Sequence, residues 1–276
     1  MKAKMKSLIR STAASVLAGA ILAVSGTPVA ASDHVDFRPP TTKPTIVLVH
    51  GAFANSSSWN QEILELQEKG YTVIAVANPL RDVGSDSAYL KSVLQTIRGP
   101  IVLVGHSYAG FVISQASAEV SNVSALVYVA AYIPMQGESP ANLTYMFPGS
   151  LLTGSNLVPR DEPTGTDLYI NAATFGQVYG GGLSKVGIAL AAAVQNPIQA
   201  SALGDPATVN PSPSIPKWEI VALEDNAIPT QAQFYMAERV RATIVTTHSG
   251  HDVPQTRPRL VVDTILQAVR SISHSN

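Results

Sequence analysis

Ser107 lies in a short turn that follows a predicted strand and precedes a predicted helix. The strand covers residues 101–104 and the helix covers residues 109–119. Gly105 and Ala109 stand two residues before and two residues after the serine, where a sharp strand–turn–helix bend leaves room only for small side chains. This context predicts a nucleophilic serine at the apex of the bend. The alternative is a serine that only caps the helix.

A serine hydroxyl is nearly inert at neutral pH unless a neighbouring base takes its proton. Four of the six histidines are set aside by position. His34 and His274 lie near the termini, and His50 ends the first predicted strand. His106 is next to the serine, with its side chain directed into the packing of the bend. His248 and His251 remain, in a loop after the last predicted strand that can reach the serine. We rank His251 first and His248 second, because His251 follows a glycine and is separated from the final helix by the longer turn.

A carboxylate must orient this base and stabilise its protonated form. Glu224 and Asp225 directly follow the predicted strand 218–223. Asp225 is preferred and Glu224 is the alternative, since neighbouring residues at a strand end face different ways. Either carboxylate could instead cap the helix that follows. The resulting order along the chain is serine, acid, base, one of the orders in which such triads occur.

Two backbone N–H groups are expected to stabilise the negative charge that develops on a substrate oxygen. One belongs to Tyr108, because it follows the serine at the start of a helix, where free amides and the helix dipole favour an anion. The other comes from the loop after the first strand, which contains Gly51. We assign it to Ala52, with Phe53 as the alternative.

The elements that would position these residues alternate along the chain. Apolar runs rich in β-branched residues are typical of strands covered on both faces, and they cover residues 45–49, 72–77, 101–104, 125–130, 218–223 and 243–246. Between them lie amphipathic stretches with the spacing of helices, at residues 59–69, 86–98, 109–119, 230–240 and 259–272. This alternation predicts an α/β fold with a doubly wound, mostly parallel sheet.

Residues 134–216 interrupt the alternation, with no clear strand and with frequent Pro, Gly, Asn and aromatic residues. We interpret them as a cap inserted into a domain of residues 32–276, over the edge of the sheet where ligands bind. Phe53, Trp59, Tyr145 and Phe147 are the candidate substrate-binding residues, because aromatic side chains commonly line apolar ligand pockets. The alternative is that these rings only pack the cap onto the core.

The first 31 residues have the pattern of a secretory signal peptide: a basic start, a short apolar stretch and a small-residue cleavage site at Val29-Ala30-Ala31. The apolar stretch is shorter than the roughly 20 residues of a membrane-spanning helix. Removal of this segment leaves 14 Lys and Arg against 19 Asp and Glu. We therefore expect an exported protein of the periplasm or the exterior, with no membrane span.

Composition excludes several classes of protein. The near-zero net charge of -1 argues against nucleic acid as a partner, and the absence of cysteine excludes disulfide scaffolds and thiolate metal sites. No glycine-rich phosphate-binding motif stands in a strand–helix context. His248 and His251 lack a third metal ligand nearby. We expect neither a cofactor nor a metal.

Several segments together resemble the α/β-hydrolases: residues 49–53 with Trp59, 78–80, 103–110, 130–134, 224–229 and 249–252. The branch that they resemble is that of bacterial esterase-like hydrolases similar to plant methylesterases and hydroxynitrile lyases. The resemblance implies a nucleophile at Ser107, an acid at Asp225 and a base at His251, with oxyanion amides at Ala52 and Tyr108. It also implies a hydrolase rather than a lyase, because the lyases of this branch carry a Thr and a Lys where this chain has Gly51 and Asp252.

The expected function is that of a secreted serine hydrolase acting on a small carboxylic ester, with hydrophobic or aromatic esters preferred over charged ones. The alternatives are a cofactor-free lyase, a lactonase or an amidase on the same scaffold, or a binding protein without catalysis. The sequence does not determine the oligomeric state.

Overall fold

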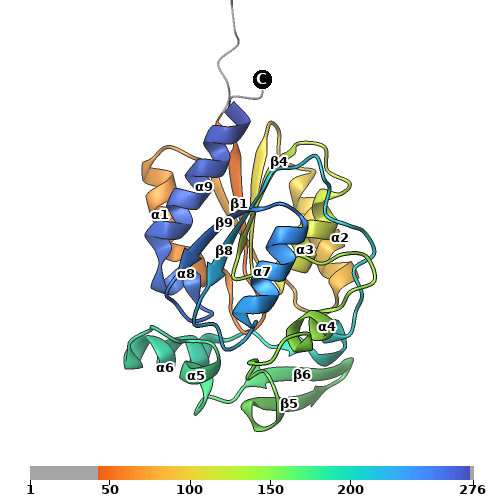
Figure 1. Ribbon diagram of the computed structural model, residues 1–276, viewed down its shortest axis with the longest axis vertical. Helices are drawn as coiled ribbons and strands as arrows, with labels where there is room; N and C mark the ends of the chain where they lie inside the picture. The colour runs from red at the N-terminus through yellow and green to blue at the C-terminus, as the bar shows by residue number, and fades with distance from the viewer. Residues whose placement is uncertain (1–42, 274–276) are drawn as a thin grey trace, which may run out of the picture. The chain divides into compact units, whose positions relative to one another are not determined.

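Six parallel strands form the central sheet of the computed structural model, which describes residues 43–273 (Figure 1). Their order across the sheet is β2-β1-β3-β4-β8-β9. The strands are β1 (Thr45–Val49), β2 (Val73–Val76), β3 (Ile101–His106), β4 (Val123–Val129), β8 (Lys217–Ala222) and β9 (Thr243–Thr247). The predicted fold class is confirmed. The predicted signal peptide, residues 1–31, lies outside the described residues.

Helices cover both faces of the sheet. On one face α2 (Val83–Leu94), α3 (Ala109–Ser117) and α7 (Thr230–Arg239) pack against alternate strand residues such as Leu103, Leu126 and Tyr128. On the other face α1 (Asn60–Glu68) and α9 (Pro258–Ser273) pack against the intervening residues, such as Val102, Val104 and Val127. In the central strands β1, β3, β4 and β8 the side chains of both faces are buried, which explains their continuous apolar runs, whereas the edge strands β2 and β9 are partly exposed.

Helix starts differ from the predicted ones where a different residue caps the helix. The predicted helix 86–98 begins at Val83, because the side chain of Asp82 accepts a hydrogen bond from the Ser85 N–H and so caps it. It ends at Leu94. The predicted helix 59–69 begins as a 3₁₀ turn, η1 (Ser56–Trp59), which Asn55 caps before α1. These shifts leave the sheet and its order unchanged.

The segment 134–216 has strands of its own, which the sequence analysis missed. β5 (Leu157–Glu162), β6 (Gly165–Ile170) and β7 (Ile198–Gln199) form a small antiparallel sheet, accompanied by α4 (Pro140–Tyr145), η2 (Gly154–Asn156), α5 (Phe175–Val178), α6 (Lys185–Val194) and η3 (Ala200–Leu203). Pro159 and three charged residues interrupt the apolar pattern of β5, which lies half exposed at the edge of the small sheet.

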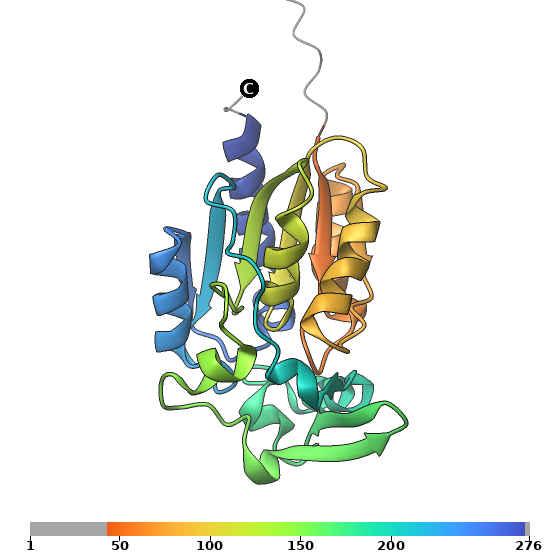
Figure 2. The same cartoon turned by 90° about the vertical axis from the view of Figure 1, so that its right-hand side faces the viewer.

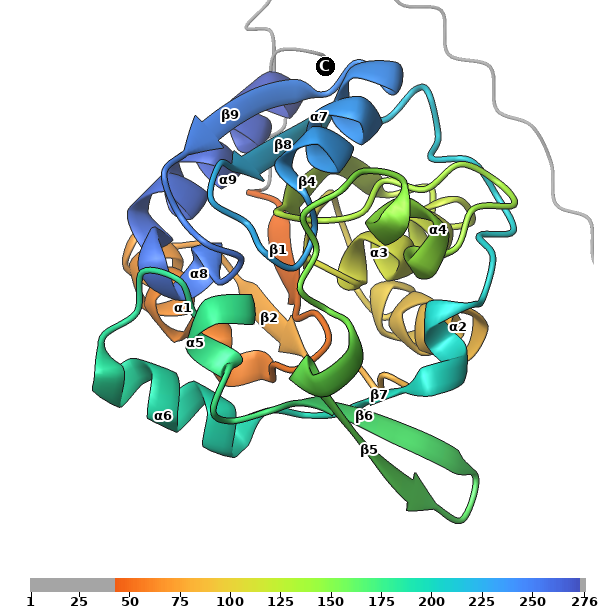
Figure 3. The same ribbon diagram turned by 60° about the horizontal axis from the view of Figure 1, so that its bottom comes forward.

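This segment lies beyond the carboxyl ends of the parallel strands (Figure 2). Figure 3 views that end of the sheet and shows α5 and α6 on the side of α1 and α8 (Val253–Thr256), with the β5–β6 hairpin pointing away from the sheet. The loops that follow β1, β3, β8 and β9 lie at the same end of the sheet as this segment (Figure 2). They carry the candidate site.

Candidate active site

Ser107 occupies a strained turn between β3 and α3. Its φ is +56°, in the left-handed region that residues other than glycine rarely adopt. A Cβ added at Gly51 would lie 2.7 Å from the Ser107 Cβ, and one added at Gly105 would lie 3.0 Å from the carbonyl oxygen of Ala109. The surrounding backbone thus packs closely around the serine, as the sequence motif predicts.

The closest backbone approach after the serine occurs at Gly110 rather than at Ala109. A Cβ at Gly110 would overlap the carbonyl oxygen of Tyr132 and lie 2.8 Å from its carbonyl carbon. Ala109 itself is fully buried, and its methyl group is accommodated. The departure of Ala109 from the usual glycine therefore leaves the turn intact.

The three residues predicted for nucleophile, base and acid form one line of hydrogen bonds. The Oγ of Ser107 lies 2.8 Å from Nε2 of His251, and Nδ1 of His251 lies 2.7 Å from Oδ2 of Asp225. All three residues are buried. With Nδ1–H donating to the carboxylate, Nε2 is free to accept the hydroxyl proton of Ser107.

Asp225 is held by donors that the sequence analysis did not find. Its Oδ1 accepts hydrogen bonds from the N–H groups of Ala227 at 2.7 Å and Ile228 at 3.0 Å. Its Oδ2 also accepts one from Nε2 of Gln233 at 2.8 Å, while the side-chain oxygen of Gln233 accepts from the N–H of Ala222 at 2.9 Å. Gln233 is fully buried on α7 and so fixes the carboxylate against the end of β8. Eight residues separate the two side chains, a spacing that carries no motif.

The alternative acid and base pair with each other, away from the serine. Nδ1 of His248 lies 3.3 Å from Oε1 of Glu224, and the two side chains are 80% and 64% exposed. In the turn after β8, Glu224 is exposed, whereas Asp225 is buried and faces His251. The geometry thus separates the two candidates for each role.

The two histidines set aside from the base role support the loops of the site. Nε2 of His106 donates to the carbonyl oxygen of His251 at 3.0 Å, and burial lowers the pKa of His106 well below 6.5, so that its ring is neutral. Nδ1 of His50 donates to the Gly51 carbonyl at 2.9 Å, and its Nε2 accepts from the Asn78 N–H at 3.0 Å. These bonds fix the loop after β1.

The backbone N–H groups of Ala52 and Tyr108 donate no hydrogen bond within residues 43–273. The N–H of Phe53, the alternative to Ala52, donates to the carbonyl oxygen of Asn196 at 3.0 Å, and Phe53 has a φ of +60°. The Tyr108 hydroxyl donates to Asp86 at 3.0 Å, which anchors the start of α3. The amides left available are the pair that the sequence analysis assigned to the oxyanion.

The sequence profile described as "Alpha/beta hydrolase family" matches residues 46–264. The chain belongs to the alpha/beta hydrolase family. A curated relative, "Probable hydrolase R7" of Phoma sp. (strain ATCC 20986 / MF5453), is 30% identical over 113 residues, which is 36% of this chain and 46% of the relative. The chain therefore matches about half the length of that relative.

Solved structures share the fold of this alpha/beta hydrolase. The pyrethroid hydrolase of Sphingobium faniae JZ-2 is similar with a TM-score of 0.69 and 20% identity, over 84% of this chain and 99% of that one. A methylesterase of Arabidopsis is similar with a TM-score of 0.67 and 20% identity, over 82% of this chain and 99% of that one. The expected α/β-hydrolase fold is thus confirmed.

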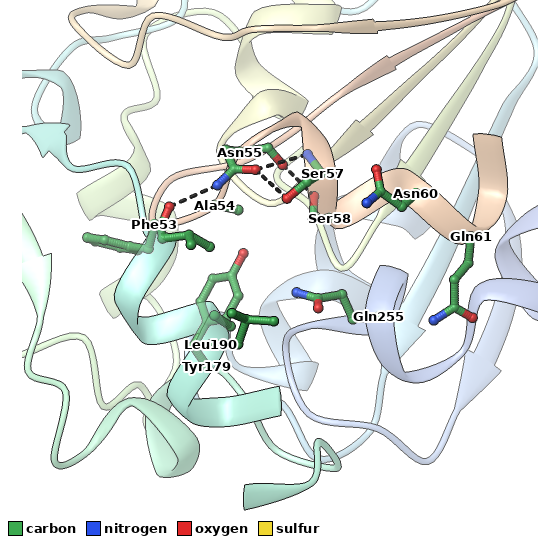
Figure 4. A pocket seen from close by; sticks show the side chains of 12 residues that line it. Phe53, Ala54, Asn55, Ser57, Ser58, Asn60, Gln61, Tyr179, Leu190 and Gln255 are labelled. Atoms are coloured by element: carbon green, nitrogen blue, oxygen red, sulfur yellow. Dashed lines mark hydrogen bonds between the residues drawn. The ribbon is translucent and has the colours of Figure 1, made fainter. Parts of the chain in front are cut away.

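A pocket of about 350 Å³ is lined by the loop after β1, by η1 and α1, and by residues of α6 and α8 (Figure 4). It shares two residues with the surroundings of the serine: Phe53, which follows the Ala52 amide, and Tyr179, whose ring lies 4.9 Å from that of His251 in an edge-to-face contact. One wall is apolar and the other carries amides and hydroxyls; the remaining lining residues are Ala54, Asn55, Ser57, Ser58, Asn60, Gln61, Leu190, Ala191, Val194 and Gln255. The lining contains no charged side chain.

Only Phe53 of the four candidate substrate-binding residues lines this pocket. Trp59 is fully buried behind the site, with its ring 6.3 Å from that of His106. Tyr145 is 56% exposed and donates to the Leu152 carbonyl, and Phe147 packs against Tyr235. Tyr179, another aromatic residue of the segment 134–216, contacts His251 instead.

The described part of the chain contains no group of three or more His, Cys, Asp or Glu that could hold a metal ion. Among those same residues, no helix is long and apolar enough to cross a membrane.

Proposed function

We propose that this alpha/beta hydrolase is a secreted serine hydrolase that cleaves carboxylic esters through an acyl-enzyme on Ser107. The observation that carries the proposal is the line of hydrogen bonds from the Ser107 Oγ through His251 to Asp225. This arrangement gives the hydroxyl a base and gives the base an orienting carboxylate, which is what nucleophilic catalysis by serine requires.

In the proposed reaction the Oγ of Ser107 attacks the ester carbonyl carbon while Nε2 of His251 takes the hydroxyl proton. The carbonyl oxygen becomes an anion, which the N–H groups of Ala52 and Tyr108 stabilise. The intermediate then expels the alcohol oxygen, which receives the proton from His251. A water molecule attacks the acyl-enzyme by the same path and releases the acid. Asp225 stays ionised throughout and stabilises protonated His251.

The pocket supports a neutral substrate. Its lining carries no charge, and burying an unpaired ion there would cost several kcal/mol. Phe53, Leu190 and Val194 offer an apolar wall to an alkyl or aryl group. We therefore favour neutral hydrophobic or aromatic esters that also carry a hydrogen-bonding group for the opposite wall.

Turnover of p-nitrophenyl acetate and of a series of longer alkyl and aryl esters tests the proposal. We expect hydrolysis by the natural chain, loss of hydrolysis with an unchanged fold in Ser107→Ala, and labelling of Ser107 by a fluorophosphonate probe. Glu224→Gln is the control for a substitution near the site that should keep activity, because Glu224 follows the same strand as Asp225 but faces solvent. Activity that survives in Ser107→Ala would refute the assignment.

The signal-peptide pattern in residues 1–31 supports export to the periplasm or the exterior. Cell fractionation after expression of the full chain tests this, with cleavage after Ala31 expected by mass spectrometry. A full-length chain retained in the cytoplasm would contradict it.

A further inference from the structure

A group of buried polar side chains lies behind the imidazole of His251. The His106 ring centroid lies 4.8 Å from that of His251 and 6.0 Å from that of Tyr179. Six buried atoms here have no hydrogen-bond partner among the described residues: Nε1 of Trp59, both carboxyl oxygens of Glu62, Nδ1 of His106, the hydroxyl of Tyr179 and Oδ1 of Asp252. None of these atoms takes part in the proposed ester hydrolysis.

Two carboxyl groups belong to this cluster. Glu62 lies on α1, one helical turn after Trp59, and its side chain is fully buried. Asp252 follows His251, its N–H donates to the Tyr179 carbonyl at 3.2 Å, and it too is fully buried. Asp252 lies near enough to Glu62 that its charge raises the pKa of Glu62.

The hydrogen-bonding capacity of the cluster favours a proton on one carboxyl group. His106 donates through Nε2, so its Nδ1 only accepts. If both carboxyl groups were ionised, the cluster would contain four acceptors without a partner: Nδ1 of His106, both oxygens of Glu62 and Oδ1 of Asp252. Only two donors without a partner lie among them, the Trp59 N–H and the Tyr179 hydroxyl. A protonated carboxyl group supplies a third donor and removes one of the four acceptors.

Electrostatics favours the same arrangement. Two buried carboxylates that act on each other do not both ionise at neutral pH unless a cation compensates them. Within residues 43–273, neither Glu62 nor Asp252 pairs with a Lys or an Arg. The guanidinium of Arg257, at the end of α8, donates instead to the carbonyls of Thr256 and His248.

The geometry points to Glu62 and Asp252 as a buried carboxyl pair that holds one proton on Glu62 and keeps a second negative charge, on Asp252, next to His251. Asp252 is the ionised member because its Oδ2 accepts a hydrogen bond from Nε2 of Gln255 at 2.7 Å, whereas both oxygens of Glu62 lack any donor among the described residues. Burial raises the pKa of Glu62 to about 8 and that of Asp252 only to about 6, where the charge of His251 acts against the rise.

The consequence concerns the base of the reaction, and here the inference rests on the proposed function. Asp252 does not touch the serine or a substrate, so it is a positioning residue that acts through His251. Its negative charge stabilises the protonated imidazole that forms when Ser107 attacks, in addition to the contact of Asp225.

Other titratable groups around the pair are few. Glu65, on α1, adds a second negative charge near Glu62, and His50 acts on His106 from the end of β1. Asp225 acts on Tyr179 from the loop after β8. Glu65→Gln is the matched control, because Glu65 lies on the same helix but is partly exposed and pairs with Lys69 at 3.4 Å.

Infrared difference spectroscopy tests the proton without any need for activity. We expect the natural chain to show the carbonyl stretching band of a protonated carboxyl group that disappears as the pH rises through about 8. Glu219 is also buried with a raised pKa, so the band is assigned by the difference between the natural chain and Glu62→Gln. Loss of the band in Glu62→Gln and its retention in Glu65→Gln support the proposal. Its retention in Glu62→Gln, or its loss only in Asp252→Asn, overturns it.

The pH dependence of kcat/KM for ester hydrolysis tests the charge on Asp252. We expect Asp252→Asn to move the acid limb of the profile about one pH unit lower, the effect of removing a nearby negative charge. Glu62→Gln should leave the acid limb in place, because one neutral group replaces another. Equal shifts in both variants would mean that both groups are ionised, and would overturn the proposal, as would a shift in neither. If no ester is turned over by any variant, the proposed function fails while the infrared experiment still tests the pair.

Discussion

The folding stability of the protein should depend on pH through Glu62. Its pKa is about 8 in the folded chain, against 4.5 for an exposed glutamate, because burial penalises the charged form more than its own backbone N–H stabilises it. The folded state therefore binds a proton that the unfolded state releases above pH 4.5. The stabilisation that this proton provides is fully present below about pH 4.5 and is lost as the pH rises through about 8.

The size of this effect follows from the difference between the two pKa values. Each unit corresponds to about 1.4 kcal/mol, so the unfolding free energy should fall by roughly 4–5 kcal/mol across this range on account of Glu62. Asp86, Glu219 and Asp252 also have raised pKa values and add to the slope. Comparison with a variant that cannot ionise at residue 62 separates their contributions from that of Glu62.

Chemical denaturation of the natural chain, Glu62→Gln and Glu65→Gln from pH 5 to pH 9 measures the effect. The unfolding free energy of Glu62→Gln relative to the natural chain should increase by about 4 kcal/mol over this range. Glu65→Gln should follow the natural chain within about 1 kcal/mol, as exposed ion pairs contribute little. A constant difference between Glu62→Gln and the natural chain would refute the assignment of a proton to Glu62.

Three further outcomes are expected. Asp225→Asn should lower kcat about 10⁴-fold with the fold retained, because the amide favours the wrong tautomer of His251; a fall of less than 10-fold in an ester assay would contradict its role. Gly110→Ala should cost about 1–3 kcal/mol or more of unfolding free energy, because its Cβ overlaps the backbone of Tyr132, whereas Gly187→Ala on α6 should be neutral or stabilising in the same thermal melt. Leu190→Asp should lower kcat/KM for long alkyl esters several-fold and leave that for acetate esters nearly unchanged, because Leu190 lines the open side of the pocket and contacts none of the reacting groups; equal losses for both would place the substrate elsewhere.

Much of the central fold could be predicted from the sequence because its central strands are buried on both faces. Such strands read as continuous apolar runs, and six of them were found in the correct order along the chain. The turn around Ser107 was equally predictable, since its close packing demands small residues at fixed positions. The choice of His251 over His248 rests on a preceding glycine and a longer turn to the final helix, and the structure brings His251 to the serine.

Other features depend on contacts between distant parts of the chain. The β5–β6 hairpin is half exposed and contains Pro159, so it lacks the period that marks a strand. Gln233 reaches Asp225 only because α7 folds back along β8. Of the four aromatic residues expected at the substrate, only Phe53 lines the pocket. No local pattern distinguishes Tyr179, which contacts His251, from Tyr145, which is exposed.

Ser107, Asp225 and His251 all come from loops of the parallel sheet, and the segment 134–216 contributes none of them. That segment instead supplies Tyr179, Leu190, Ala191 and Val194 to the pocket. The remaining pocket residues lie before this segment or on α8, so the segment forms only one side of the pocket. Exchange of the segment for that of another member of the family should change which molecules the pocket accepts, while Ser107, Asp225 and His251 stay in place. The segment is therefore a suitable region to diversify when a new specificity is sought.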